Sequence, residues 1–445
     1  MGAGASRKGR SVSEEPLEKL PVEAQTALRH AAEGVSQDSN ADQAIAHIIH
    51  ALSKARLGLG PPSHGSPPLK FLVTMDPGQD LDDEMFLVLM ASLERRKLIS
   101  CRGVVTTLAP SAIRAQLASG TLRALGLGRI PVAAGTDGGS TGDSAAVDAM
   151  GQVTYLSRGL SCTRGLQSPT ERAGFSLLHS GLLSAEEHSL VIIVIASLKD
   201  VAELLREAEA LFVLKVKQVV IQGGVEAFTS GVAADGVQLH PDSAHNNEFD
   251  ADASRFVYER CQQLGIPLLV LSRFAAYGCQ IPRGIYDRMA ALGGSIGQHL
   301  CHVQRSSIER LWQRACAPEG SPARGGLPAR CDRGWFCSTF CGGAGGESGA
   351  SDSIWDCVIS FNMYDPLALV AAVPELAERF FECDELVVGG TTHKVVGASK
   401  DRPGVKEGSG LREWLCEKFL EGASMETLYA LPSNRRGSSL ASYSL

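Results

Sequence analysis

The sequence predicts an α/β fold built on an open, mostly parallel, Rossmann-like sheet flanked by helices. Two observations carry this prediction. From residue 69 onward, short β-rich runs alternate with segments of helical periodicity, which is typical of a parallel sheet with helices on both faces. In addition, a chain of 445 residues with 44% hydrophobic and 20% charged residues can bury a full globular core. Ligands in this architecture bind at the carboxyl ends of the strands, so the residues after each strand are the candidate functional residues.

The predicted strands and helices follow one another in a regular order. Strands are expected at KFLVTM, CRGVVTTL, IPVAA, SLVIIVI, KQVVIQGG and IPLLVL, because apolar and β-branched residues dominate each run. Helices are expected from about Asp83, from Ala112 to Leu125, from Lys199 to Phe212 and from about Asp252. Residues 69–430 are therefore expected to form one α/β domain.

Three appendages are expected around this domain. Residues 1–68 form an N-terminal extension with a disordered start, two short helical runs within 21–57 and a linker rich in Pro and Gly. Residues 316–353 are rich in Gly, Ala, Ser, Pro and Cys and are expected to form an insertion loop. The polar, serine-rich residues 431–445 are expected to be a disordered tail.

The first ten residues, MGAGASRKGR, match the acceptor pattern for N-myristoylation at Gly2, with Ser6 at the expected spacing. One acyl chain binds membranes only marginally, and the basic residues of this segment would add attraction to anionic lipid. The alternative is a solvated tail. The expectation is thus a cytoplasmic protein, with membrane association through the N-terminus as the open alternative.

Charge and cysteine content narrow the class of protein. The formal net charge of −7, from 42 Lys plus Arg against 49 Asp plus Glu, argues against nucleic acid as a partner. The 12 cysteines follow no apolar export signal and are expected to be reduced thiols. Within the insertion, the spacing of Cys331, Cys337 and Cys341 does not match a paired CxxC zinc motif. A metal site completed by His299 or His302 is the alternative.

The segment VTMDPGQDLDDEMFLVLM, residues 73–90, is the most informative part of the chain. Asp76, Asp80, Asp82 and Asp83 crowd one strand-to-helix turn. Helix capping by Asp82, Asp83 and Glu84 is one interpretation, because acidic side chains favour the positive end of a helix. Capping does not account for Asp76, which the other carboxylates would repel. Oxygen ligands at this density suit a hard cation such as Ca²⁺.

Several motifs occur in an order that resembles the inosine-uridine preferring nucleoside hydrolase family. They are DPGxxxDD after the first strand, GVVTTLA, IPVAAGTD, SLKDVAELL, VVIQGGV and the late YDPLA. The resemblance spans roughly residues 69 to 400, interrupted by the insertion. It implies the nucleoside hydrolase fold and a tightly bound Ca²⁺ that chelates the ribose hydroxyls and a water. The implied reaction is cleavage of an N-glycosidic bond.

The resemblance also implies roles for individual carboxylates. Asp76 would bind Ca²⁺ and take the proton from the attacking water. Asp82 and Asp83 match a pair of aspartates, of which Asp82 would contact both metal and ribose. Because the turn is two residues longer than in the commonest form of the motif, Asp80 is an alternative to Asp82 as ligand. Asp365 would be the remaining carboxylate ligand and a substrate contact.

Further positions match less completely. The main-chain carbonyl of Ile195 would be a metal ligand, and Asn246 or Asn247 would bind the ribose. Tyr364 takes the place of the histidine that is proposed to protonate the leaving base in many members of the family, and a tyrosine can donate a proton only if it is well placed. His240 and His245 are alternatives, and Phe249 could stack on a base. Two sugar-binding positions also differ from the family and are occupied by Ala244 and Ser111.

Two functions follow as expectations. The first is a Ca²⁺-dependent hydrolase of a purine or pyrimidine ribonucleoside, or of a related ribosyl compound. The alternative is a catalytically weak or inactive relative that holds a metal and a ribosyl ligand, attached to a membrane by its N-terminus. Because members of the family often form dimers or tetramers, the resemblance also implies a homo-oligomer.

Overall fold

The structure is a computed structural model that describes residues 67–424, apart from residues 79, 140–159, 161–162, 164–165, 167–171, 233–235, 326, 328, 344–348 and 350–352. The myristoylation site at Gly2, the helical runs before residue 57 and the predicted tail lie outside the described residues. In the part that is described, no helix has the length and apolar character that crossing a bilayer requires.

A nine-stranded sheet lies at the centre of the described chain, in the order β3-β2-β1-β4-β5-β7-β11-β10-β6. All neighbouring strands are parallel except β10 and β11, which pair antiparallel. The structure therefore confirms the predicted open, mostly parallel sheet. The strands are β1 (Leu69–Met75), β2 (Ile99–Thr106), β3 (Val132–Ala134), β4 (Leu190–Val194), β5 (Val216–Gln222), β6 (Gly231–Val232), β7 (Leu268–Leu271), β10 (Asp384–Val388) and β11 (Thr391–Val396).

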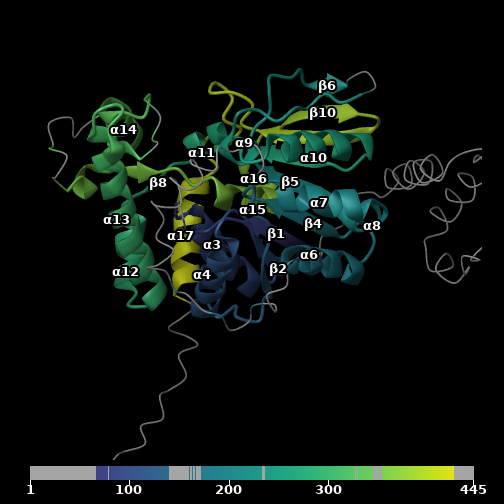
Figure 1. Ribbon diagram of the computed structural model, residues 1–445, viewed down its shortest axis with the longest axis horizontal. Helices are drawn as coiled ribbons and strands as arrows, with labels where there is room; N and C mark the ends of the chain where they lie inside the picture. The colour runs from purple at the N-terminus through teal and green to yellow at the C-terminus, as the bar shows by residue number, and fades with distance from the viewer. Residues whose placement is uncertain are drawn as a thin grey trace, which may run out of the picture.

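Helices cover both faces of this sheet and bury two apolar cores. Alternate residues of β1 point to opposite faces, so Phe71 and Val73 enter one core and Leu72 enters the other. The first core includes α3 (Asp82–Arg95), α4 (Ser111–Ala124), α15 (Asp365–Ala372), α16 (Pro374–Phe380) and α17 (Leu411–Ala423). The second core includes α6 (Ala173–Ser184), α7 (Lys199–Glu207), α8 (Glu209–Lys215) and α10 (Ala251–Gln263) (Figure 1).

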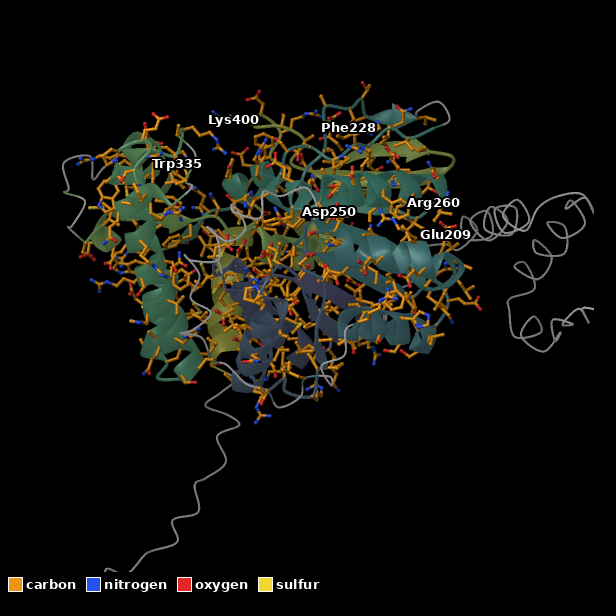
Figure 2. The ribbon with its side chains drawn as sticks, in the orientation of Figure 1. Glu209, Phe228, Asp250, Arg260, Trp335 and Lys400 are labelled. Atoms are coloured by element: carbon orange, nitrogen blue, oxygen red, sulfur yellow. The ribbon has the colours of Figure 1, made fainter. Side chains whose placement is uncertain are left out.

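The helix predicted from Lys199 to Phe212 is two helices, so this prediction was wrong in its extent. The chain leaves helical geometry at Ala208, with φ −129° and ψ 35°, between α7 and α8. Glu209 then begins α8 and accepts two hydrogen bonds from the guanidinium of Arg260 on α10, at 2.5 and 2.7 Å (Figure 2). The bidentate pair holds α8 against α10, a contact that helical periodicity along one segment cannot reveal.

The insertion at 316–353 was expected to be a loop, and this expectation was wrong. It contains α14 (Arg333–Phe340), which begins where the side chain of Asp332 accepts a hydrogen bond from Trp335 N at 2.8 Å. Phe336 is fully buried, and its ring lies 5.1 Å from that of Trp312 on α13 (Ser295–Cys316). With α12 (Gly284–Ala291), these helices extend to one side of the sheet (Figure 1).

The thiols of Cys331, Cys337 and Cys341 are buried and form no disulfide. The alternative of a metal site with His299 finds no support, because Nε2 of His299 instead lies 3.5 Å from the carboxylate of Glu84. Within the described residues, the group with metal-ligand spacing is one of aspartates.

Candidate metal centre

Three segments place acidic residues at the carboxyl edge of the sheet. β1 ends at Met75, and Asp76, Pro77 and Gly78 turn the chain, with Gly78 at a φ of 114° that favours glycine. α3 then begins at Asp82. α15 begins with Asp365 and packs beside α3. Because β1 and β4 are parallel neighbours, the end of β4 lies at the same edge.

The carboxylates at this edge are close together and largely buried. Asp80, Asp82 and Asp83 each place one carboxylate oxygen within 4.8 Å of the others. Asp76 and Asp82 are 8% exposed, Asp83 is 2% exposed and Asp365 is 4% exposed, whereas Asp80 is exposed. Both Asp80 and Asp82 thus lie where a shared cation could bind.

Backbone hydrogen bonds hold two of these carboxylates in place. The N–H of Asp76 donates to Oδ1 of Asp83 at 3.0 Å, across the turn. The N–H of Tyr364 donates to Oδ2 of Asp82 at 3.3 Å, although the two residues are 282 positions apart. Leu81, at the start of α3, receives no side-chain cap. The acidic residues of this turn therefore bind distant backbone groups rather than cap their own helix.

The electrostatics of the site favour a bound cation. Burial raises the pKa of Asp76 to about 7, and the charge of Asp80 adds to the rise, whereas Arg114 opposes it. Burial and neighbouring carboxylates raise the pKa values of Asp82, Asp83 and Asp365 well above their ordinary range. Buried carboxylates at this density are costly to ionise together unless a cation compensates them.

The donor set fits Ca²⁺. Asp80, Asp82 and Asp83 offer carboxylate oxygens, which hard cations prefer, and Ca²⁺ takes about 6 to 8 oxygen ligands in flexible geometry. Neither imidazole nor thiol belongs to the group of aspartates within the described residues. The chemistry of the donors therefore does not suit a softer metal such as zinc.

Arg114 is a site residue that was missed in the sequence. It lies on α4, is 2% exposed, and donates from Nη1 to the carbonyls of Asp76 at 2.7 Å and Pro77 at 2.9 Å. These bonds fix the turn that carries Asp76. One arginine within an amphipathic helix looks like an ordinary surface residue, so only the contact across 38 positions reveals its role.

The structure separates the two predicted ribose-binding asparagines. Asn246 is partly buried and donates to the carbonyl of Gln222 at 3.2 Å and to its side-chain oxygen at 2.6 Å, at the end of β5. Asn247 is buried and donates to the carbonyls of Gly224 at 3.0 Å and Asp242 at 3.1 Å. Asn247 thus ties the loop together, and Asn246 is the better placed of the two for a ligand.

Ile195 lies directly after β4, where its N–H donates to the carbonyl of Thr74 at 3.0 Å and its side chain is buried. Ser111 begins α4 and donates to the carbonyl of Gly135 at 3.0 Å. Ala244 precedes α9 (His245–Glu248), and its N–H donates to Asp242 at 2.8 Å. The last two residues therefore have structural contacts at positions where the resembled family binds sugar.

A row of aromatic rings leads from solvent to the carboxylates. On α11 (Arg273–Gly278), the rings of Phe274 and Tyr277 lie 6.2 Å apart, and Tyr277 lies 6.4 Å from Tyr364. The hydroxyl of Tyr364 accepts a hydrogen bond from Nδ2 of Asn362 at 3.2 Å. Burial raises the pKa of Tyr364 above that of an ordinary tyrosine. Tyr364 therefore keeps its proton at neutral pH.

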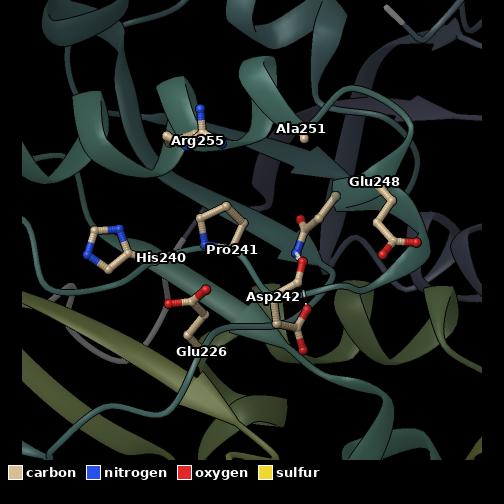
Figure 3. Close-up of a pocket in the computed structure, with 8 residues that line it drawn as sticks. Glu226, His240, Pro241, Asp242, Glu248, Ala251 and Arg255 are labelled. Atoms are coloured by element: carbon tan, nitrogen blue, oxygen red, sulfur yellow. Dashed lines mark hydrogen bonds between the residues drawn. The ribbon is translucent and has the colours of Figure 1, made fainter. Parts of the chain in front are cut away.

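The two alternative histidines lie between β6 and α10, with His245 at the start of α9. His240 lines a cavity of about 330 Å³ together with Glu226, Asp242, Glu248 and Arg255 (Figure 3). His245 is exposed and packs edge-on against Phe249 at 4.8 Å. Phe249 is buried, so it has no open face on which a base could stack.

Comparisons with known proteins support the fold. No protein-family model and no curated protein matches the sequence. Among solved structures, the effector protein XOO4466 is 27% identical, with a TM-score of 0.65 over 84% of this chain and 98% of that chain. The type III effector protein XopQ, solved in complex with adenosine diphosphate ribose, is 28% identical, with a TM-score of 0.64 over 85% of this chain and 98% of that chain.

A purine-preferring ribonucleoside hydrolase from Gardnerella vaginalis has a TM-score of 0.51 at 15% identity, over 80% of this chain and 99% of that chain. At this identity the likeness concerns the fold alone. The chain therefore has a nucleoside hydrolase-like α/β fold, as the sequence motifs implied.

Proposed function

We propose that this protein is a Ca²⁺-dependent hydrolase that cleaves the N-glycosidic bond of a ribosyl compound. The observation that carries the proposal is the close group of Asp80, Asp82 and Asp83, which lies beside the buried carboxylates of Asp76 and Asp365. The nucleoside hydrolase-like fold supports a ribosyl-binding or hydrolase function in general. Adenosine diphosphate ribose in the XopQ structure supports a ribosyl ligand in particular.

The ion would be held by Asp76, Asp82, Asp83, Asp365 and the main-chain carbonyl of Ile195, with Asp80 as the alternative to Asp82. When bound, Ca²⁺ supplies a fixed positive charge that orients the sugar hydroxyls and makes water more acidic. Asp80 is exposed, whereas Asp82 is buried and accepts a hydrogen bond from Tyr364 N. This difference supports Asp82 as the ligand and leaves Asp80 as the alternative.

The chain's own residues then position the reactants. Asp76 accepts the proton of the attacking water, and Arg114 keeps its backbone in place through the two carbonyl contacts. Asp82, Asp365 and Asn246 bind the ribose hydroxyls. Holding water and sugar together in this way removes much of the entropic cost of the reaction.

A second candidate function is binding of a ribosyl ligand with little or no turnover. Tyr364 favours it, because a buried tyrosine with a raised pKa is a weak proton donor to a departing base. Ser111 and Ala244 also favour it, since both have structural contacts. Adenosine diphosphate ribose is the natural test ligand for this candidate.

One experiment separates the two functions. The purified full-length protein is incubated with Ca²⁺ and a panel of purine and pyrimidine nucleosides, and free ribose is measured beside calorimetric binding of adenosine diphosphate ribose. Asp76→Asn and Asp365→Asn should lose ribose release and Ca²⁺ binding, whereas Asp252→Asn, on the exposed face of α10, should match the parent protein. Ligand binding without ribose release from any nucleoside supports the second function. Absence of both activities contradicts the proposal.

A further inference from the structure

We infer that the hydrolase acts on N-ribosyl pyridinium compounds, in which the leaving group is a positively charged aromatic ring. This inference rests on the proposed hydrolase function and specifies its substrate class. It is carried by the aromatic row beside the carboxylates, by the charge balance of the site, and by the residue that precedes Asp365.

The aromatic row provides a surface for a planar ring. Phe274 and Tyr277 meet edge to face at 84°, and Tyr277 and Tyr364 meet at 70°. Tyr277 is 49% exposed, and its ring contacts that of the partly buried Tyr364, which precedes a candidate metal ligand. Because each pair is edge to face, the ring of Tyr277 keeps a solvent-facing surface on which a ligand ring can lie.

The row leads directly to the sugar-binding carboxylates. Tyr364 directly precedes Asp365, and its N–H donates to Asp82. A ribose held by Asp82 and Asp365 would therefore place the substituent on its anomeric carbon near the rings of Tyr364 and Tyr277.

The charge balance favours a cation in that position. Asp80, Asp82 and Asp83 lie close together at this edge beside Asp76 and Asp365, and Arg114 contacts the turn that carries Asp76. Arg273, on the same helix as Tyr277, lies 3.9 Å from the carboxylate of Asp242 and faces the ring of Phe274. A cationic ring is thus attracted both by the carboxylates and by the faces of the tyrosine rings.

The way in which the leaving group departs agrees with a pyridinium substrate. When the bond from C1′ to the pyridinium nitrogen breaks, the electron pair stays on nitrogen and the ring leaves as a neutral molecule without taking a proton. Water oxygen bonds to C1′, and its proton passes to Asp76. A purine or pyrimidine would leave as an anion unless protonated, and the position before Asp365 carries a phenol, already bound by Asn362, instead of an imidazole.

The test compares four compounds: nicotinamide riboside, inosine, uridine and the uncharged 1,4-dihydronicotinamide riboside. Each is incubated with the full-length protein and Ca²⁺, and kcat/KM is measured from the release of ribose. Because a positioned general acid contributes at least about 100-fold, a substrate that needs none should exceed the nucleosides by about that factor. The dihydro compound has nearly the same shape and should be inert. Nicotinamide adenine dinucleotide is run in parallel, with release of nicotinamide measured for both compounds, to distinguish the free riboside from the dinucleotide as source of the same ring.

Tyr277 is tested as the specificity residue. Tyr277→Leu should raise KM for nicotinamide riboside about 5-fold with a much smaller change in kcat, and Tyr277→Phe should restore most of the affinity, because the ring face is what binds. Should Tyr277→Leu fold poorly, binding of nicotinamide riboside to Tyr277→Phe, compared with binding of the dihydro compound, still reports preference for the cation.

The outcomes separate this inference from the proposed function. Faster hydrolysis of inosine or uridine than of nicotinamide riboside overturns the inference and leaves the hydrolase function standing. Equal binding of the charged and dihydro compounds overturns it as well. If ribose is released from none of these compounds, nor from p-nitrophenyl riboside with its activated leaving group, the hydrolase function itself is wrong and the inference falls with it.

Discussion

Removing one buried carboxylate should stabilise the metal-free protein above neutral pH. Asp76 has a folded pKa of about 7 against an ordinary value of 3.8. Below about pH 4 the carboxyl is protonated in the folded and unfolded states, and it contributes no pH dependence. Between about pH 4 and 7 the unfolded state loses its proton first, so the folded state becomes progressively less stable. Above about pH 7 the loss of folding free energy caused by burying this carboxylate reaches its full size.

The size of this cost follows from the two pKa values. At about 1.4 kcal/mol for each pKa unit, the shift of Asp76 corresponds to about 4 kcal/mol at pH 8. Unfolding entropy of about 2.1 cal/mol/K per residue over the roughly 315 described residues gives about 0.7 kcal/mol per degree. Between pH 5 and pH 8 about 2 of the 3 pKa units act, or about 2.7 kcal/mol, so the Tm of the metal-free protein should fall by about 4 °C more than that of Asp76→Asn.

Thermal melts in a chelating buffer, followed by circular dichroism at pH 5 and pH 8, measure this difference. Asp252→Asn is the matched control, because its side chain is 72% exposed. With Ca²⁺ at about 100 times its Kd, the parent protein should gain about 2.7 kcal/mol at pH 8, and Asp76→Asn should gain much less. If parent and Asp76→Asn lose the same Tm between the two pH values, the carboxylate of Asp76 is not destabilised by burial and the electrostatic reasoning is refuted.

Three further changes test other parts of the structure. Arg114→Met removes the donor to two backbone carbonyls and should lower the free energy of unfolding, measured by denaturant titration, by about 2 to 3 kcal/mol. The same substitution should weaken Ca²⁺ binding, and an unchanged Ca²⁺ affinity would show that Arg114 does not support the site. Phe336→Ala should lower the free energy of unfolding by about 3 to 5 kcal/mol, because it leaves a cavity at a fully buried position against Trp312. Trp335→Ala, at a less buried neighbouring position, should lower it by less. Equal losses would show that α14 is not packed as described. Gly2→Ala should shift the protein from the membrane fraction to the supernatant in cell fractionation, and identical fractionation of both forms would contradict acylation.

Local patterns in the sequence predicted six of the nine strands of the central sheet and missed β6, β10 and β11. A parallel strand is a short apolar run, and the helix that follows has its own period, so both can be recognised within a few residues. The same holds for the acidic turn, where Asp76, Asp80, Asp82 and Asp83 are neighbours in the chain and become neighbours in space.

Contacts between distant segments could not be predicted in this way. Arg114 reaches the turn from another helix, and the aromatic row joins α11 to the start of α15. The insertion was misjudged for a different reason: its many Gly and Ser residues obscured the sequence RGWFCSTF, whose aromatic residues form α14 and pack on Trp312. Composition averaged over a long segment conceals a helix of eight residues within it.

The hydrogen bond between Tyr364 and Asp82 joins residues 282 positions apart. During synthesis at about 5 to 20 residues per second, the acidic turn leaves the ribosome roughly 15 to 60 s before its partner segment exists. In that interval the carboxylates of the turn lack both Asp365 and the backbone donor of Tyr364. A nascent chain therefore cannot assemble the complete candidate site, and a cation bound there would contribute its full stabilisation only after nearly the whole chain has been made.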